Sequence, residues 1–256
     1  MENSLLVGLS RQMVLARELD VVANNIANVN TNGFKEDESV FQEYLMPIAR
    51  QNQFPGVTDR QLSYVIDRGT WRNMDQGSLE HTGNPLDVAI DGNAFLVVQT
   101  ANGPRYTRDG SLKINAAGQL VTSNGDLLQG DNGPITFQQT DHDISITADG
   151  RITVLEGANT VTEAARGHLS VVTFAEPQQL QKDGSNAYIA PAGVVPAPAT
   201  NFKLIQGHVE KSNVNGVVQM SRLIEITRSY QEVANLLQQE GDLHKNAIQQ
   251  LAEIPS

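Results

Sequence analysis

The residues of this chain that could do chemistry are its five histidines and its many carboxylates. The histidines are scattered, and none forms the paired spacing by which two imidazoles on one helix bind zinc. One acidic cluster includes a histidine, Asp141-His142-Asp143, and we interpret it as a solvated loop before a strand at residues 144–147, with a metal site as the less favoured alternative. Asp87, Asp91 and Gly92 lack the ligand spacing and the closing glutamate of a calcium loop.

Sequence motifs for catalysis and nucleotide binding are also missing. No GxSxG elbow, P-loop or GxGxxG fingerprint occurs. Carboxylates are abundant enough to supply a pair for glycoside hydrolysis, but acidic residues on a surface usually serve solvation. The sequence therefore predicts a protein that is not an enzyme, with no catalytic residue, no cofactor and no metal site.

The charge and composition of the chain exclude several classes of partner. A net charge of -11 and a pI near 4.8 oppose binding to nucleic acid, which needs clustered lysine and arginine. No run approaches the ~18 apolar residues that would span a bilayer, so no membrane insertion is expected. The acidic and basic residues among the first 20 do not fit a signal peptide. The absence of cysteine excludes disulfides and thiolate metal sites.

The N-terminal segment predicts an amphipathic helix over residues 4–28, because its apolar side chains repeat at helical spacing. The first row comprises Leu6, Leu9, Met13, Ala16, Asp20, Ala23 and Ala27, of which only Asp20 is polar. The second row, beside it, comprises Leu5, Leu15, Leu19, Val22 and Ile26. The helix is expected to end at Asn32-Gly33, because glycine adopts the left-handed conformation of a helix C-terminus at little cost.

The C-terminal segment predicts a second amphipathic helix over residues 216–252. Its main row comprises Leu223, Ile226, Tyr230, Val233, Leu237, Glu240, His244, Ala247, Leu251 and Ile254. Val217, Met220 and Ile224 widen the start of this row. Ser212 or Asn213 is expected to cap the helix by accepting hydrogen bonds from its first backbone N–H groups.

Both predicted helices, at roughly 25 and 37 residues, exceed the usual three or four turns. Neither end has a core of its own, so each must cover its apolar row with a partner. The other helix is the simplest partner, followed by helices of further copies. A coiled-coil-like pair explains the length, and two ordinary helices packed on a globular domain are the alternative.

The middle of the chain predicts short strands joined by tight turns. Seven dipeptides favour positive φ and hence hairpins: Asp91-Gly92, Asn102-Gly103, Asp109-Gly110, Asn124-Gly125, Asn132-Gly133, Asp149-Gly150 and Asp183-Gly184. The strand signatures are Leu86–Ile90, Ala94–Thr100, Leu112–Asn115, Leu120–Thr122, Ile144–Thr147, Ile152–Val154 and Leu169–Phe174. This spacing predicts an antiparallel sheet structure or a partly closed barrel. Residues 190–199 are expected to form an extended connection back to the terminal helix.

The predicted fold class is α+β, with long N- and C-terminal helices that form a coiled-coil-like pair and an inserted, mainly antiparallel β domain. We divide the chain into an N-terminal helix (1–33), a connecting segment (34–75), a β-rich domain (76–200) and a C-terminal connection with its helix (201–256). The connecting segment predicts a short helix or strand near residues 40–46, a polar loop near residues 51–56 and extended chain near residues 64–71.

Motifs at three places in the sequence carry a resemblance to a known family. The run Ala23-Asn-Asn-Ile-Ala-Asn-Val-Asn-Thr-Asn-Gly-Phe-Lys35 closely resembles the N-terminal signature of the flagellar rod and hook proteins, and Ser212-Asn-Val-Asn215 resembles their C-terminal signature. Between them, the run from Gln76 to Ile90 and Tyr106-Thr-Arg-Asp-Gly110 resemble their shared β domain. The resemblance covers essentially the whole chain in order.

The asparagines of the first motif also have a physical reading. Asn24, Asn25, Asn28, Asn30 and Asn32 lie at and just beyond the predicted helix end. Asparagine side chains bond to nearby backbone groups, so they could fix how the chain leaves the helix. The same amides could bridge packed copies, and capping of one helix alone is the alternative.

The resemblance implies a structural subunit of the bacterial flagellar basal body that stacks helically, with terminal helices inside and β domains outside. Its partners would be other copies of itself, other rod proteins, proximal and distal, and the surrounding ring components. It implies a periplasmic rod location and export by the flagellar type III system. The expected assembly interface comprises Leu6, Leu9, Met13, Ala16, Ala23, Asn24, Asn25, Ala27, Asn28, Asn32, Ser212, Asn213, Asn215, Leu223, Ile226, Tyr230, Val233 and Leu237.

Within the family, three features point to a proximal rather than a distal rod subunit. They are the start Met1-Glu-Asn-Ser-Leu-Leu, the segment 126–135 and the lack of a long glycine-rich stretch after residue 50. A distal rod subunit is the closest alternative. Two other classes remain open: a rod-associated cell-wall hydrolase, and an adhesin whose β domain binds a ligand through exposed aromatic residues.

Overall fold

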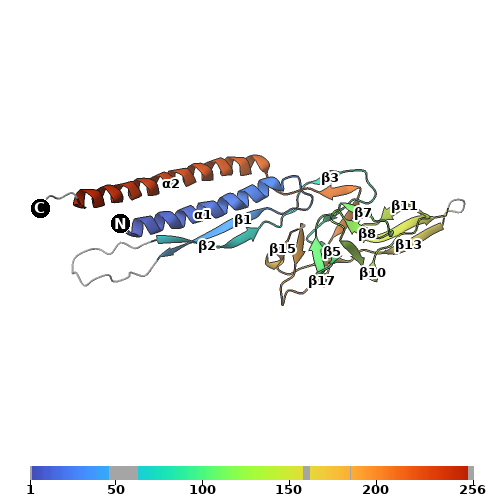
Figure 1. Ribbon diagram of the computed structural model, residues 1–256. Coiled ribbons are helices and arrows are strands. Elements are labelled where there is room, and N and C mark those ends of the chain that lie inside the picture. The colour runs from blue at the N-terminus through green and yellow to red at the C-terminus, as the bar shows by residue number, and fades with distance from the viewer. Residues whose placement is uncertain (1, 46–62, 158–161, 185, 253–256) are drawn as a thin grey trace. The chain divides into compact units, whose positions relative to one another are not determined.

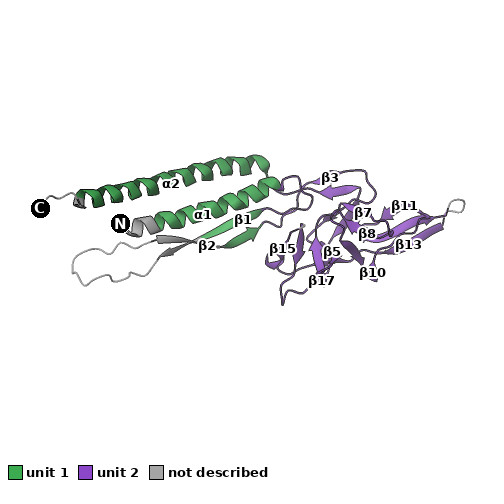
Figure 2. Cartoon of the chain, viewed as in Figure 1, with its two compact units in different colours: residues 1–27, 37–72, 215–256 green, residues 28–36, 73–214 purple. Residues whose placement is uncertain are grey.

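The computed structural model describes residues 2–45, 63–157, 162–184 and 186–252. It contains two helices and many strands (Figure 1), and each ladder in the described residues is antiparallel, so the predicted α+β class is confirmed. The loop predicted near residues 51–56, Ile254 and the side chains of Leu5, Leu6 and Leu251 lie outside what the structure describes. The chain divides into two compact units (Figure 2): unit 1 comprises residues 1–27, 37–72 and 215–256, and unit 2 comprises residues 28–36 and 73–214.

Unit 1 consists of two antiparallel helices and one long hairpin. Its elements are α1 (Glu2–Ala27), β1 (Asp37–Leu45), β2 (Ser63–Arg72) and α2 (Gly216–Ala252). Helix α1 lies beside α2 and also contacts the hairpin (Figure 1). The hairpin confirms the strand alternative for the start of the connecting segment, and its register shifts between Val40 and Phe41.

Helix α1 ends at Ala27, five residues before the predicted stop at Asn32-Gly33. The chain turns at once, because the backbone N–H of Thr31 donates to the carbonyl of Asn28 and the Thr31 hydroxyl donates to the Asn28 side chain. Gly33 does adopt positive φ, at 69°, but its role lies in the connection rather than in a helix cap. A Cβ there would lie 2.6 Å from the carbonyl carbon of Arg108.

Helix α2 has the predicted bounds, but its cap is Asn215 rather than Ser212 or Asn213. The Asn215 side-chain oxygen accepts hydrogen bonds from the backbone N–H groups of Val217 (3.2 Å) and Val218 (3.3 Å). This is the geometry of a residue immediately before the first helical turn. Asn213 is instead used by unit 2, as described below.

Unit 2 is built from short antiparallel strands around two apolar clusters. Its elements are β3 (Leu79–His81), β4 (Val88–Asp91), β5 (Phe95–Thr100), β6 (Gly103–Thr107), β7 (Leu112–Ile114), β8 (Leu120–Thr122), β9 (Leu127–Gly130), β10 (Gly133–Pro134), β11 (Asp141–Ile146), β12 (Arg151–Glu156), β13 (Thr162–His168), β14 (Val171–Thr173), the 3-10 turn η1 (Pro177–Gln179), β15 (Gln181–Asp183), β16 (Ala187–Ile189), β17 (Ala197–Pro198), β18 (Lys203–Gln206) and β19 (His208–Glu210).

The largest sheet of unit 2 follows the order β15-β16-β6-β5-β9-β8-β7, with β10, β14 and β17 added at its sides. A second sheet has the order β11-β12-β13, and two ladders join β18 to β4 and β19 to β3. Aliphatic side chains from most of these strands form one core, which includes Ile90, Leu96, Leu128 and Ile152. Aromatic side chains form the other, in which Tyr106 and Phe174 meet edge to face at 4.8 Å.

Five of the seven predicted turns lie between strands that pair with each other, but the turns at Asp91-Gly92 and Asp109-Gly110 do not. Gly110 is needed for close approach instead: a Cβ there would lie 1.7 Å from the carbonyl oxygen of Val88. The extended connection predicted at residues 190–199 includes β17, and it leads to β18 and β19 before the terminal helix.

Candidate functional site

The two apolar rows of α1 have different environments. The second row is covered: Val22 is 2% exposed, and Leu15, Leu19 and Ile26 are partly buried. The first row is open, with Leu9 46% and Met13 68% exposed. Along the same row, Asp20, Ala23 and Ala27 are exposed and Ala16 is partly buried. The row predicted to form an assembly interface therefore carries exposed apolar side chains in the subunit.

Helix α2 shows the same division. Ile226 of its main row is 4% exposed, and Leu223, Tyr230, Val233 and Leu237 are partly buried. The residues that were expected to widen this row face elsewhere, since Val217 is 77%, Met220 58% and Ile224 55% exposed. At 100° per residue these three lie on the opposite side of the helix from Ile226, which explains the difference.

Contacts between α1 and α2 include an ion pair and a close approach of the two helices. The guanidinium of Arg222 donates to the carboxylate of Glu18 at 2.9 and 3.1 Å. Nearer the chain termini, a Cβ added to Gly8 would lie 2.6 Å from Cδ2 of Leu237, so glycine lets the helices approach closely.

Asn25 joins α1 to the hairpin and to α2. Its amide nitrogen donates to the carbonyl of Asp37 at 2.8 Å, and its oxygen accepts from the Asp37 N–H at 3.0 Å. The same nitrogen lies 3.5 Å from Oε1 of Gln219 in α2. Because Asn25 is 1% exposed, its contacts are within the subunit. Asn24 is exposed on the same helix.

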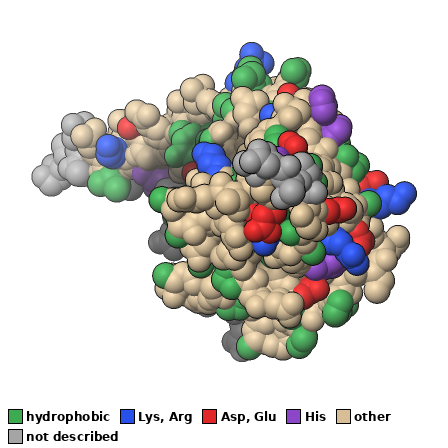
Figure 3. Space-filling view, turned by 90° about the vertical axis from the view of Figure 1, so that its right-hand side faces the viewer, with side chains coloured by type: hydrophobic (Ala, Val, Ile, Leu, Met, Phe, Trp, Pro, Cys, Tyr) green, Lys and Arg blue, Asp and Glu red, His purple; other side chains and the backbone are tan. Residues whose placement is uncertain are grey.

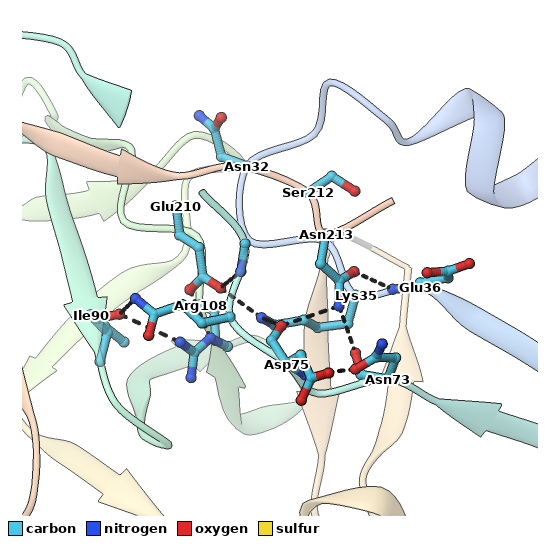
Figure 4. A network of polar contacts seen from close by, with 12 residues as sticks. Asn32, Lys35, Glu36, Asn73, Asp75, Ile90, Arg108, Glu210, Ser212 and Asn213 are labelled. Carbon is cyan, nitrogen blue, oxygen red and sulfur yellow. Dashed lines mark hydrogen bonds and ion pairs between the residues drawn. The ribbon is translucent and has the colours of Figure 1, made fainter. Parts of the chain in front are cut away.

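The remaining polar residues of the predicted interface lie in unit 2, apart from the cap Asn215. Asn213 accepts from the N–H of Glu36 at 2.8 Å and donates to the carbonyls of Asn73 (3.0 Å) and Asp75 (3.1 Å) (Figure 4). Ser212 accepts from the N–H of Val214. Asn28 holds the turn after α1, and the carbonyl of Asn32 accepts from the Asn186 side chain.

A buried charge cluster in unit 2 was not predicted from the sequence (Figure 4). The ammonium of Lys35 lies 2.6 Å from Oε1 of Glu210, and Nε of Arg108 lies 2.8 Å from Oε2 of the same carboxylate. The three side chains are 0–2% exposed. Glu210 also accepts from the N–H of Gly77, so its two oxygens receive three hydrogen bonds.

Backbone carbonyls complete the partners of both cations. Arg108 donates to the carbonyls of Gly92 and Ala94, both at 2.9 Å, and to that of Ile90 at 3.4 Å. Lys35 donates to the carbonyl of Asp75 at 2.6 Å. Burial, together with the Arg108 charge, lowers the pKa of Lys35 to about 8 from 10.5, although Glu210 acts in the opposite direction.

The cluster fixes three chain segments that are far apart in sequence. Residues 34–36 follow α1, residues 73–77 follow the hairpin, and residues 208–213 precede α2. A network satisfied in this way holds its members in one arrangement, because any displacement leaves buried charge unpaired. One feature of the sequence could have indicated this cluster. Lys35 and Arg108 each lie inside a motif that resembles the family, and Glu210 lies two residues before another such motif.

The cluster Asp141-His142-Asp143 belongs to strand β11 and not to a loop, which corrects that reading. Asp141 is held by Arg166, whose hydrogen bond lowers the pKa of this carboxyl, and Asp143 has φ of 49° where the ladder shifts register. Among the described residues no group of three or more metal-binding side chains comes together. None of the described helices has the length and apolar character needed to cross a bilayer.

On the face of unit 2 in Figure 3, hydrophobic side chains lie scattered among polar ones. Of the large hydrophobic side chains exposed in the described residues, Trp71 alone is aromatic, and it belongs to unit 1, so the described part of unit 2 has no exposed aromatic patch of the kind expected for an adhesin. Among the described residues, exposed large apolar side chains at helical spacing lie on α1 and α2; besides the rows described above, they include Leu236 and Leu243 further along α2.

Comparison with known proteins identifies the family of this chain. Residues 5–35 match the model of the flagella basal body rod protein, residues 89–154 that of the flagellar hook protein FlgE/F/G D1 domain, and residues 205–250 that of the flagellar basal body rod FlgEFG protein C-terminal region. The chain is 39% identical over 256 residues to the flagellar basal-body rod protein FlgF of Caulobacter vibrioides, covering 99% of this chain and 100% of that protein. It belongs to the flagellar basal-body rod protein family.

Other flagellar rod proteins match over most of their length. The FlgF of Rhizobium meliloti is 35% identical over 96% of both chains. The FlgG of Buchnera aphidicola subsp. Baizongia pistaciae is 34% identical over 88% of this chain and 89% of its own. Two residues of the buried charge cluster lie within the family matches. Lys35 is the last residue of the match over residues 5–35, and Glu210 lies in the match over residues 205–250.

Proposed function

We propose that this chain is a structural subunit of the flagellar basal-body rod, in its proximal part, and that it polymerises through its terminal helices into a torque-transmitting tube. Relatives named FlgF that match nearly the whole chain support the proximal placement. Relatives named FlgG keep a distal rod subunit as the alternative. The family's structural role supports a protein without enzymatic activity.

The observation that carries this proposal is the open row on α1. Leu9 and Met13 are large, apolar and exposed, while the neighbouring row of the same helix is used inside the subunit. Apolar side chains in a row of this kind mark a surface that another chain covers. Helix α2 carries a corresponding open row.

The helices are proposed to act as a coiled-coil-like pair that forms the inner wall of the tube. Their length and close approach at Gly8 and Leu237 support this arrangement. We also propose the functional division predicted from the sequence, in which residues 1–33 and 201–256 supply assembly, residues 34–75 the connection and residues 76–200 the outer surface. The exposed members of the predicted interface contact neighbours, whereas Asn25 and Asn213 shape each subunit.

The proposed partners are other copies of the chain and other proximal and distal rod proteins, with ring components of the basal body around them. The proposed location is the periplasmic rod, reached through the flagellar type III export system. A tube with contacts along two long helices per subunit would resist torsion, because no single contact has to transmit the load.

The test introduces one carboxylate into the open row. Leu9→Asp should abolish motility in cells that lack the native gene, and the variant should be missing from isolated basal bodies although it is exported. Arg11→Asp is the matched control, since Arg11 is exposed but lies about 160° around the helix from Leu9. Normal incorporation of Leu9→Asp would contradict the proposal, and so would equal loss in the control.

A further inference from the structure

The open row of α2 is a surface that no other part of the described chain covers. Val217, Met220 and Ile224 are more than half exposed and are spaced three and four residues apart, so they form one continuous row. Arg228 is exposed and extends this row by four residues, one further turn. The row therefore presents three large apolar side chains followed by one positive charge.

The open row of α1 has complementary size and charge along its second half. Ala23 and Ala27 are exposed and small, and they leave a shallow strip one helical turn long. Asp20 is exposed one turn before Ala23 and gives this strip a single negative charge. When the two helices run antiparallel, the large apolar residues of α2 therefore face the small residues of α1, and the arginine of α2 faces the aspartate of α1, at nearly equal spacing.

The two open rows do not meet within one chain. On α1, Asp20 lies about 160° around the helix from Glu18, which contacts Arg222 of α2. On α2, Ile224 lies about 160° around the helix from Ile226, which belongs to the covered row. Because both rows face away from the intramolecular contact, a copy of the chain is needed to bring them together.

We propose that the open row of α2 in one copy docks antiparallel on the open row of α1 in the next copy, with Ile224 over the strip between Ala23 and Ala27 and Arg228 paired with Asp20. This inference rests on the proposed function and names the contact that builds the tube. The antiparallel direction follows from copies that share one orientation, since α1 and α2 run in opposite directions within each copy (Figure 1).

The geometry of this contact gives a filament. The contact joins two different faces of the subunit. After one contact has formed, each copy still has its other row free for a further copy, so the contact can repeat. Inside the subunit Glu18 pairs with Arg222, whereas the proposed contact pairs Asp20 with Arg228. The register changes by eight residues when measured from the Glu18–Arg222 pair and by three when measured from the approach of Gly8 to Leu237. At 1.5 Å per residue, successive copies are displaced by roughly 5–12 Å along the helix axis, so the chain of contacts rises and does not close into a flat ring.

Charge reversal tests the ion pair. Asp20→Arg and Arg228→Asp should each reduce motility strongly, and the double variant should restore it. The proposal is overturned if both single variants swim normally, or if the double variant is no better than either single one. If these variants swim while Leu9→Asp does not, the rod function stands and this pairing fails.

Cysteine cross-linking identifies the partner, because the chain has no cysteine of its own. Cells that co-express Ala27→Cys and Met220→Cys chains should yield, on mild oxidation of basal bodies, a disulfide-linked dimer containing one chain of each kind. Ala27→Cys with Leu243→Cys is the control, since Leu243 is 68% exposed but lies far along α2, and it should give no dimer. Absence of the dimer in assembled rods, or a cross-link to a different rod protein instead, would overturn the proposal.

Discussion

The ammonium of Lys35 and the carboxylate of Glu210 lie 2.6 Å apart, and neither side chain is exposed to solvent. The pair connects the segment that leaves α1 with the strand that leads into α2, although 175 residues separate them in sequence. Glu210 also pairs with Arg108, so two buried cations share one carboxylate. The chain therefore enters and leaves unit 2 at one fixed point.

Replacing the shared carboxylate should destabilise unit 2 severely. Glu210→Gln leaves Lys35 and Arg108 without a counter-charge in a buried site, and breaking a buried pair in this way costs about 3–5 kcal/mol. Chemical denaturation measures the change in the free energy of unfolding. Glu80→Gln is the control, because Glu80 is 60% exposed in its pair with Lys211 and should change stability by less than ~1 kcal/mol. A similar small loss for Glu210→Gln would contradict the role given to the cluster.

The lowered pKa of Lys35 predicts a dependence of stability on pH. Below pH 8 the lysine is protonated in both states; between about 8 and 10.5 the folded protein releases the proton that the unfolded chain keeps. The free energy of unfolding should therefore rise with pH across this window relative to that of Lys35→Met, which has no such proton. Denaturation of both proteins at a series of pH values measures the difference. A difference that stays constant or falls above pH 8 would contradict it.

Asn25 should matter for the stability of unit 1 in spite of its polar character. Asn25→Ala leaves the N–H and carbonyl of Asp37 without their side-chain partners, at a cost of about 1–3 kcal/mol. The single tryptophan of the chain, Trp71, lies in β2, so its fluorescence reports unfolding of unit 1. Asn30→Ala, at an exposed position, is the matched control. Equal melting curves for both variants would show that the Asn25 contacts contribute nothing.

Two leucines that the sequence assigned to one interface should behave differently. Leu237→Asp places a charge on the covered side of α2, beside Gly8, and should loosen the helix pair in the free subunit. Leu9→Asp changes an exposed side chain and should leave the melting temperature of the subunit nearly unchanged. Far-ultraviolet circular dichroism of the purified variants measures both. A large loss of helix in Leu9→Asp would mean that the open row is already in use within the subunit.

Helical spacing in the sequence was enough to locate α1 and α2, because 3.6-residue periodicity is a local property. It did not show which row would be covered. Val217, Met220 and Ile224 fit the pattern as a broadening of the main row, yet they face away from α1. That choice depends on the position of the partner helix, which is set by contacts such as that of Glu18 with Arg222 and is invisible in a single helix.

The turn residues predicted much of unit 2 but not its connections. Asp109-Gly110 has the composition of a hairpin turn, and its glycine is required by the nearby Val88 carbonyl instead. The charge cluster was beyond local reasoning, because Lys35, Arg108 and Glu210 become neighbours only after the segments before and after unit 2 converge. Capping by Asn215 rather than Asn213 follows for the same reason, since Asn213 is engaged by residues 36, 73 and 75.

Electron cryo-microscopy of an intact basal body that contains this chain tests the central claim most directly. We predict that the outward rows of α1 and α2, at Leu9, Met13, Val217 and Ile224, will be covered by helices of neighbouring rod subunits. A rod in which these side chains face open solvent, with neighbours joined through unit 2 alone, would contradict the account.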